Sequence, residues 1–178
     1  DLNDVLGNFI NRVLKMTIGN FGEQVPPLSD ITDDEKTLYE TVDDLTASYT
    51  SYMDGLEFRK AMGALRELFV AGNNYIAKTE PWKAAKTDKA RAGTILNTAL
   101  NLIHLYAQLS APIMPQTAEK MLAVVNLKTP FVWPKDKANA VLKTLKEGDK
   151  INPSDPLFFK ITPERQEELR LKYKETEA

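Results

Sequence analysis

Residues 89–109, KARAGTILNTALNLIHLYAQL, decide the fold of this chain. They predict a helix with apolar side chains on most of its sides, including Ile95, Leu96, Leu100 and Ile103. A helix that faces solvent keeps a polar stripe, so a helix with so little polar surface is expected at the centre of a domain. The sequence therefore predicts an all-α fold built around residues 89–109.

Amphipathic helices are predicted on both sides of this central helix. Apolar residues recur at i, i+3, i+4 and i+7 spacing over 2–17, and an apolar stripe runs along 57–78. Thr32-Asp33-Asp34-Glu35 has the form of a capping box, which starts another helix. Breaks are expected at Gly19, Gly22, Pro26-Pro27, Asp54-Gly55, Pro112 and Pro115. The result is an antiparallel bundle of about five helices, at 2–17, 32–53, 57–78, 89–109 and 116–125, with a short helix from Pro81.

The C-terminal part of the chain differs from the bundle. Prolines recur between 127 and 161, which predicts an irregular extension over 127–178 beside a bundle at 1–126. Its expected elements are a short helix at 137–145, a short strand or docking segment at 157–161, and a charged final helix from Thr162 to about Glu175. We expect this extension to dock on the bundle or on another part of a longer protein.

Composition narrows the function classes. The 178 residues contain no cysteine, which excludes disulfides, cysteine-type zinc sites and a thiol nucleophile. A net charge of -2 excludes a generally polycationic arm, so nucleic acid would have to bind a local patch. No apolar run approaches a membrane span and no signal peptide is recognisable, so we expect a soluble, cytoplasmic protein. The helical pattern already runs at Leu2, without an initiating Met, which suggests a piece of a longer protein.

No enzyme active site is recognisable in the sequence. His104 lies on the most apolar helix without a nearby carboxylate cluster, so we interpret it as a structural, hydrogen-bonded histidine. The acidic run from Asp30 to Asp44 covers a helix start and its exposed face, where the helix dipole and solvation account for it. Phosphate-binding glycine loops are absent as well. We predict no catalytic residue, no metal site and no cofactor in this chain.

Two features suggest binding. Asn8, Asn11, Arg12 and Lys15 form one stripe of hydrogen-bond donors on the side of the first helix that faces away from the core. Arg and Asn can pair bidentately with base edges, and Arg also with phosphates, although an ordinary solvated face explains the spacing equally well.

The second feature is Pro81-Trp82. An indole beside lysines at a helix start is typical of single-stranded nucleic-acid binders, in which a base stacks on the ring. The alternative is a tryptophan folded back onto the previous helix as a hydrophobic staple. Residues 81–92 carry a local charge of +3, from Lys83, Lys86, Lys89 and Arg91 against Asp88.

Together these residues resemble the C-terminal anticodon-binding helix bundle of methionyl-tRNA synthetases, a class I aminoacyl-tRNA synthetase family. The resemblance rests on Leu6-Gly7-Asn8-Phe9-Ile10-Asn11-Arg12 and on the Asn73-Asn74-Tyr75 stretch that leads to Pro81-Trp82. It continues through Asn97–Leu102, Ala111-Pro112-Ile113-Met114-Pro115, Ile151-Asn152-Pro153 and Leu157–Ile161, and so spans nearly the whole chain.

The resemblance implies a role for each matched residue. Trp82 would stack on the first base of the CAU anticodon of methionine tRNA, a cytosine, while Asn8 and Arg12 bind base edges. Pro81 would fix the direction from which Trp82 approaches the base. Asn11 would support the same stripe, and Lys15, Lys83 and Lys86 would approach phosphates.

The motifs for ATP chemistry in this family, His-Ile-Gly-His and Lys-Met-Ser-Lys-Ser, do not occur here. The resemblance therefore implies a binding piece whose partners are methionine tRNA and an N-terminal catalytic domain, with ATP, and zinc in some members, belonging to that domain. Two alternatives stay open from the residues alone. One is a protein-interaction module that uses the extension, and the other is the same bundle from a leucine or cysteine synthetase, against which the Pro-Trp pair argues.

Overall fold

The computed structural model describes residues 2–128, 131–134, 137–153, 157–158 and 161–174. Its elements, in chain order, are the π-helical turn η1 (Leu2–Gly7), α1 (Asn8–Phe21), α2 (Asp33–Asp54), α3 (Phe58–Thr79), α4 (Pro81–Thr87), α5 (Lys89–Ser110), α6 (Pro115–Val124), the 3-10 helix η2 (Ala138–Lys143) and α7 (Pro163–Lys174). An isolated antiparallel bridge joins Gln24 to Lys150. The predicted all-α bundle is confirmed.

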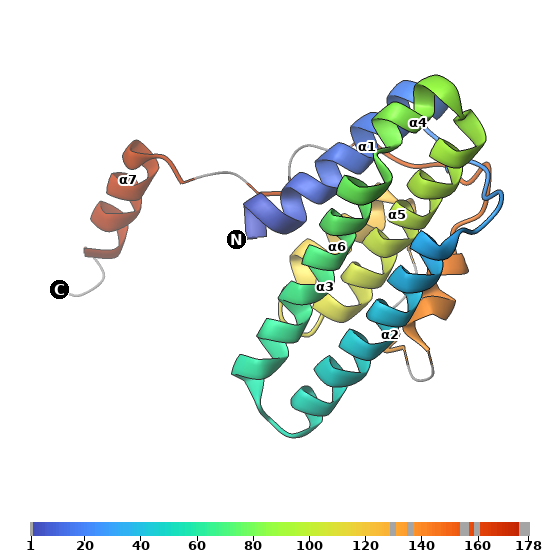
Figure 1. Cartoon of the computed structure of the whole chain (residues 1–178). Helices are drawn as coiled ribbons and strands as arrows, with labels where there is room; N and C mark the ends of the chain where they lie inside the picture. The colour runs from blue at the N-terminus through green and yellow to red at the C-terminus, as the bar shows by residue number, and fades with distance from the viewer. Residues whose placement is uncertain (1, 129–130, 135–136, 154–156, 159–160, 175–178) are drawn as a thin grey trace.

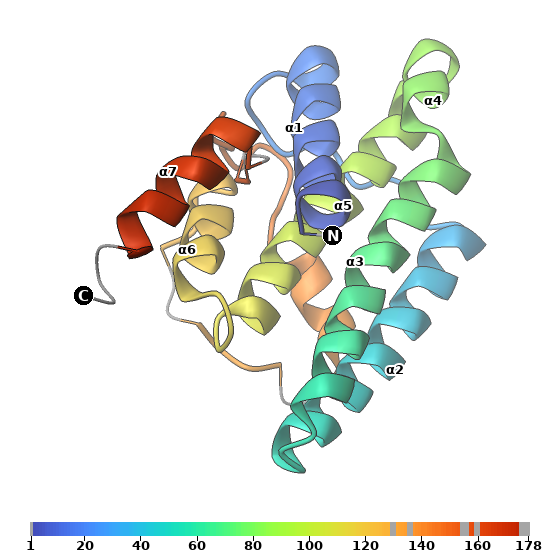
Figure 2. The same cartoon turned by 90° about the vertical axis from the view of Figure 1, so that its left-hand side faces the viewer.

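α5 is the central helix of the bundle, as predicted. Every residue from Ala92 to Ser110 is buried, and α5 contacts α1, α3, α4, α6 and η2 (Figures 1 and 2). Its polar residues are used as well, because Asn97 Nδ2 donates to the Pro26 carbonyl at 2.8 Å and Asn101 Oδ1 accepts from the Leu145 amide at 2.8 Å. Buried amides thus fix two loops onto a helix that is otherwise held by apolar packing.

α2 and α3 form an antiparallel pair, and α1 lies beside α3, pointing toward α4 (Figure 1). Gly72 of α3 lies against side chains of both α1 and α5. A Cβ at Gly72 would collide with the Tyr106 hydroxyl and lie 3.1 Å from the Phe9 ring. The Phe9 and Tyr106 rings themselves pack with centroids 5.6 Å apart. The absence of a side chain at Gly72 therefore lets Phe9 of α1 and Tyr106 of α5 pack against α3.

The first helix differs from the prediction at both ends. Residues 2–7 are π-helical, and α1 continues through Gly19 to Phe21, so the expected break at Gly19 is wrong. One glycine costs a helix only ~1 kcal/mol relative to alanine, and packing of Ile18 against the core offsets that cost. The helix ends at Gly22, whose φ of 77° and ψ of −167° form a backbone conformation that glycine adopts readily and other residues rarely do.

Much of the extension packs on the bundle. Leu142, Leu145 and Ile151 are buried in the core, and Asp43 of α2 accepts hydrogen bonds from the amide and the side chain of Asn139, at 2.9 and 2.7 Å. The short helix expected over 137–145 is the 3-10 helix η2. α7 stands apart from the bundle in Figure 1.

The segment at 157–161 was expected to be a strand or a docking segment. Leu157 and Phe158 pack against the core without strand pairing, and Ile161 is exposed. Phe159 and Lys160 lie outside the described residues. The described part of this segment thus behaves as docking chain.

Candidate nucleic-acid interface

The donor stripe of α1 lies on the surface, with one member partly covered. Asn8, Arg12 and Lys15 are exposed, and Asn11 is half-buried. The Asn8 amide nitrogen donates to the Asp4 carbonyl at 3.1 Å, which leaves its oxygen without a partner among the described residues. The opposite side of the same helix carries Phe9, Ile10, Val13 and Leu14 into the core. The amphipathic pattern therefore fixes which way the polar stripe faces.

Arg12 is held in its orientation by Asn73, a residue for which no role was predicted. Its Nη2 donates to Asn73 Oδ1 at 2.5 Å, and Asn73 Nδ2 donates to the carbonyls of Val5 at 3.0 Å and Phe69 at 2.9 Å. These two acceptors fix the orientation of the Asn73 amide, so its oxygen faces Arg12. The other guanidinium N–H groups of Arg12 have no partner within the part of the chain that the structure describes. Asn73 belongs to the Asn73-Asn74-Tyr75 stretch on which the resemblance rests, but its contact with Arg12 could not be predicted from the sequence.

The tryptophan lies at the start of α4, after a sharp change of chain direction. Glu80 adopts a left-handed conformation, with φ 45° and ψ 58°, and it ends α3 and caps α4 at once. Pro81 is buried at the first helical position, while Trp82 is 40% exposed and lies outside the core cluster. α1 contacts α4, so the helix that carries the donor stripe and the helix that carries Trp82 are neighbours in the bundle (Figure 1).

The lysines around Trp82 differ in their partners. Lys83 forms an ion pair with Glu80 at 2.8 Å, and Lys89 lies 5.3 Å from the centroid of the Phe21 ring. Lys86 and Lys15 are exposed, and neither has an ion-pair partner among the residues described here. Lys86 and Lys15 are therefore the two cations of this surface that no neighbouring side chain holds.

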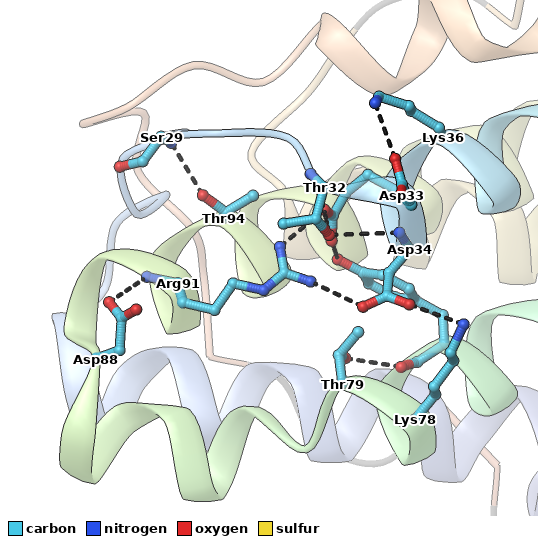
Figure 3. A network of polar contacts seen from close by, with 12 residues as sticks. Ser29, Thr32, Asp33, Asp34, Lys36, Lys78, Thr79, Asp88, Arg91 and Thr94 are labelled. Carbon is cyan, nitrogen blue, oxygen red and sulfur yellow. Dashed lines mark hydrogen bonds and ion pairs between the residues drawn. The ribbon is translucent and has the colours of Figure 1, made fainter.

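Arg91 is not part of the exposed basic surface, so the local charge of +3 overstates what a ligand would meet. Its side chain is 20% exposed and donates to Glu35 at 2.7 Å and to Asp34 at 3.4 Å. Figure 3 shows Arg91 reaching from α5 toward Asp34, which also receives Lys78 at 2.8 Å. Arg91 thus belongs to a polar network that joins α2, α3 and α5.

Glu35 is the centre of that network and is fully buried, which corrects its assignment to an exposed acidic face. Besides Arg91, the Tyr75 hydroxyl donates to it, as do the amide and hydroxyl of Thr32, both at 2.8 Å. Burial alone would raise the pKa of Glu35, but these hydrogen bonds outweigh burial and lower the pKa. Burial and the bond to Glu35 raise the pKa of Tyr75 far above its ordinary value. Glu35 is therefore ionised, and Tyr75 remains a donor.

His104 is buried on α5, as expected for a structural residue. Its Nε2 lies 2.9 Å from Gln108 Nε2, and its Nδ1 has no hydrogen-bond partner among the described residues. Burial lowers the pKa of His104 from 6.5 to about 4. Gln108, which contacts His104, accepts at its Oε1 a hydrogen bond of 2.6 Å from the Val132 amide. Gln108 therefore links His104 to the extension.

In the described ranges, no group of three or more His, Cys, Asp or Glu side chains is arranged to hold a metal ion. None of the described helices is long and apolar enough to span a bilayer.

Comparison with known proteins identifies the family. A sequence model described as the anticodon binding domain of methionyl tRNA ligase matches residues 25–178. The chain belongs to this family. It is 45% identical over 165 residues to the methionine–tRNA ligase of Caulobacter sp. (strain K31), covering 93% of this chain and 29% of that protein. The ligase of Jannaschia sp. (strain CCS1) is 42% identical over 173 residues, with 97% and 30% covered.

A solved structure of the same family shows the same fold. The free-state methionyl-tRNA synthetase of Mycobacterium tuberculosis superposes with a TM-score of 0.79 at 26% identity, over 92% of this chain and 33% of that one. The chain spans about 30% of the length of the curated relatives that it matches. These matches favour the methionyl family over an unrelated protein-interaction module and over the leucine and cysteine synthetases.

Proposed function

We propose that this chain recognises the CAU anticodon of methionine tRNA on behalf of a methionyl-tRNA synthetase. The observation that carries the proposal is an exposed tryptophan, Trp82, on α4, a helix that contacts α1, which carries the stripe of donors. Unstacked anticodon bases are recognised by aromatic stacking together with hydrogen bonds to their edges. Family membership supplies the choice of RNA, and these side chains supply the contacts.

Stacking on Trp82 would provide much of the affinity. A base that stacks on an aromatic side chain gains ~1–3 kcal/mol, and the exposed indole offers such a surface without unfolding. Pro81 fixes φ at the first position of α4, and the left-handed Glu80 sets the angle at which α4 leaves α3. These two residues would therefore set the direction from which Trp82 meets the first anticodon base.

Asn8 and Arg12 would read the edge of that base. Cytosine offers an amino group together with two acceptors, N3 and O2, whereas uracil replaces the amino group with a carbonyl. The unpartnered oxygen of Asn8 can accept from the cytosine amino group, and the N–H groups of Arg12 can donate to the acceptors. A uracil in the same place would leave Asn8 facing another acceptor, which penalises the wrong base.

Lysines of α1 and α4 would bind the phosphates of the RNA. Lys15 and Lys86 are the best placed, because neither has an ion-pair partner among the described residues. Lys83 would first have to leave Glu80, so we assign it a smaller share. Asn11 is half-buried, so it would contribute less to RNA binding than the exposed residues of the stripe.

The catalytic steps belong to the remainder of the synthetase. We propose that a catalytic region outside this chain attaches methionine to tRNA with ATP in the cytoplasm, and that any zinc is held there. A second solved relative, from Mycobacterium tuberculosis, carries methionyl-adenylate. We also propose the division into a bundle at 1–126 and an extension at 127–178. Ala138, Leu142, Leu145 and Ile151 of the extension pack in the core of the bundle. α7 would contact the catalytic region.

The direct test is a titration of this chain with two RNA hairpins that differ in the first anticodon base, CAU and UAU, at one salt concentration. We expect the CAU hairpin to bind at least roughly fivefold more tightly, because a well-formed pairing with a base edge is worth about 1–3 kcal/mol. Both hairpins share the same stem, so phosphate contacts cancel in the ratio. Equal affinities would overturn the assignment of Asn8 and Arg12 to base reading.

A further inference from the structure

The chain on each side of α4 is hydrogen-bonded to one buried carboxylate, that of Glu35. Tyr75, one turn before the end of α3, donates its hydroxyl to Glu35, and Arg91, in the first turn of α5, donates to it at 2.7 Å. The chain between these donors includes the whole of α4. Glu35 itself is held at the start of α2 by the capping box with Thr32. One side chain thus fixes the point where the chain enters α4 and the point where it leaves.

A second layer of contacts repeats this arrangement at the protein surface. Asp34, next to Glu35, pairs with Lys78 of α3 at 2.8 Å and with Arg91 at 3.4 Å. Figure 3 shows Asp34 between these two cations. Asp88 accepts from the Arg91 amide at 2.9 Å and caps α5, which stiffens the exit from α4. α2 therefore acts as the anchor for both flanks of α4.

α4 depends on its neighbours because a helix of its length is not stable by itself. A helix of seven residues is too short to be stable alone, and of its residues only Pro81 is buried. α4 packs on α5, with Ala84 against the core, and the direction of Trp82 depends on this packing and on how firmly the two flanks of α4 are held. Removing the Glu35 charge would deprive Arg91 of its nearest charged partner and leave the Tyr75 hydroxyl facing a poorer acceptor, which loosens both flanks.

We propose that Glu35 is a positioning residue for anticodon recognition: through Tyr75 and Arg91 it holds the chain on both sides of α4 and so fixes the direction of Trp82. Glu35 does not touch RNA in this arrangement, because it is fully buried. The assignment rests on the proposed function for its consequence, since a fixed Trp82 matters only if a base stacks on it.

The test compares Glu35→Gln with the unchanged protein in a Trp133→Phe background, where Trp82 is the remaining tryptophan of the two in the chain. Without RNA, we expect faster reorientation of the indole in fluorescence anisotropy decay and roughly tenfold faster hydrogen exchange of the α4 amides. With the CAU hairpin, we expect roughly tenfold weaker binding, the size that follows from losing one charged hydrogen bond. The helix content should stay the same.

A matched control separates positioning from general stability. Asp43→Asn lies on the same helix and also removes a carboxylate that accepts two hydrogen bonds, at 2.9 and 2.7 Å from Asn139, but its partner belongs to η2. It should lower the melting temperature without changing Trp82 motion or RNA affinity. If Glu35→Gln behaves as Asp43→Asn does, the positioning role is overturned.

Two further variants keep the proposal decidable. Tyr75→Phe retains the Glu35–Arg91 pair and releases only the α3 side, so it should shift Trp82 motion in the same direction by less, even if Glu35→Gln does not fold. An unchanged Trp82 in Tyr75→Phe would count against the proposal. In a Trp82→Ala background, Glu35→Gln should cause no further loss of RNA affinity, because its effect passes through the indole. An undiminished loss there would also overturn the role.

The measurements distinguish the two hypotheses. If the unchanged protein binds CAU and UAU hairpins equally, the proposed function fails, while the motion of Trp82 without RNA still decides whether Glu35 holds α4. If the hairpins are discriminated and Trp82 is indifferent to Glu35, only the positioning role fails.

Discussion

α4 and α5 are separated by one residue in the chain and are held in place by opposite means. α5 is buried from Ala92 to Ser110, and its position follows from apolar contacts with helices on all sides. α4 exposes most of its seven residues and packs on α5, and the chain on both sides of it, at Tyr75 and Arg91, is hydrogen-bonded to Glu35 of α2. The comparison shows how a rigid core can carry an exposed aromatic side chain. Apolar packing builds the frame, and a few directed hydrogen bonds hold the chain on both sides of α4, which carries Trp82, the residue that we propose to stack on a base.

The largest expected effect breaks the frame. Leu100→Ala in α5 removes a side chain that is fully buried, so we expect a loss of about 2–5 kcal/mol in the free energy of unfolding, from lost burial plus the cavity left behind. Urea titration followed by circular dichroism measures it. The control is Leu171→Ala in α7, where the side chain is 58% exposed and a change within about 0.5 kcal/mol is expected. Equal losses at both positions would contradict the central place of α5.

The next effect separates binding from folding, by comparing the two tryptophans. Trp82→Ala should weaken binding of the CAU hairpin by ~1–3 kcal/mol and leave the helix content intact, because its ring is not part of the core. Trp133 donates to Thr50 at 3.1 Å and packs on Tyr49 at 5.3 Å between ring centroids. Trp133→Ala should therefore lower stability with little change in RNA affinity. If Trp82→Ala melts the bundle instead, Trp82 is a hydrophobic staple.

The smallest effect is a pH dependence that belongs to the frame alone. The pKa of His104 is about 4 when folded and 6.5 ordinarily, so between these values the unfolded chain binds more protons and stability falls as pH falls. From pH 7 to pH 5 we expect the free energy of unfolding to drop by on the order of 1–2 kcal/mol. His104→Gln should flatten this slope in urea titrations at both pH values, because the chain has one histidine. An unchanged slope would assign the dependence to other groups.

Several features of the fold were predictable because they depend on residues close together in the chain. The all-round apolar pattern of α5 predicted its central place, and Thr32 with Glu35 predicted the start of α2, where the capping box is present. The expected break at Gly19 failed because side-chain packing outweighed a small intrinsic cost. The stripe from Asn8 to Lys15 was predictable from helical spacing. The roles of its members in binding RNA stay predictions.

The residues that hold the candidate site in place could not be predicted in the same way. Asn73 lies 61 positions from Arg12, and Arg91 lies 56 positions from Glu35, yet each pair shares a hydrogen bond. In the sequence, Glu35 belongs to an acidic run and Arg91 to a basic cluster, so both resemble surface residues. Only burial distinguishes them, and burial depends on which helices pack together.

The sequence by itself determined the helices, the apolar side of each, the central helix and the motif that relates this chain to its family. These follow from periodicity and local chemistry, which act over a few residues. The tertiary structure alone decided that α1 meets α4, that Asn73 aims Arg12, and that Glu35 is buried between Tyr75 and Arg91. A buried ion pair forms only where packing excludes water from both partners, and that condition is a property of the assembled bundle.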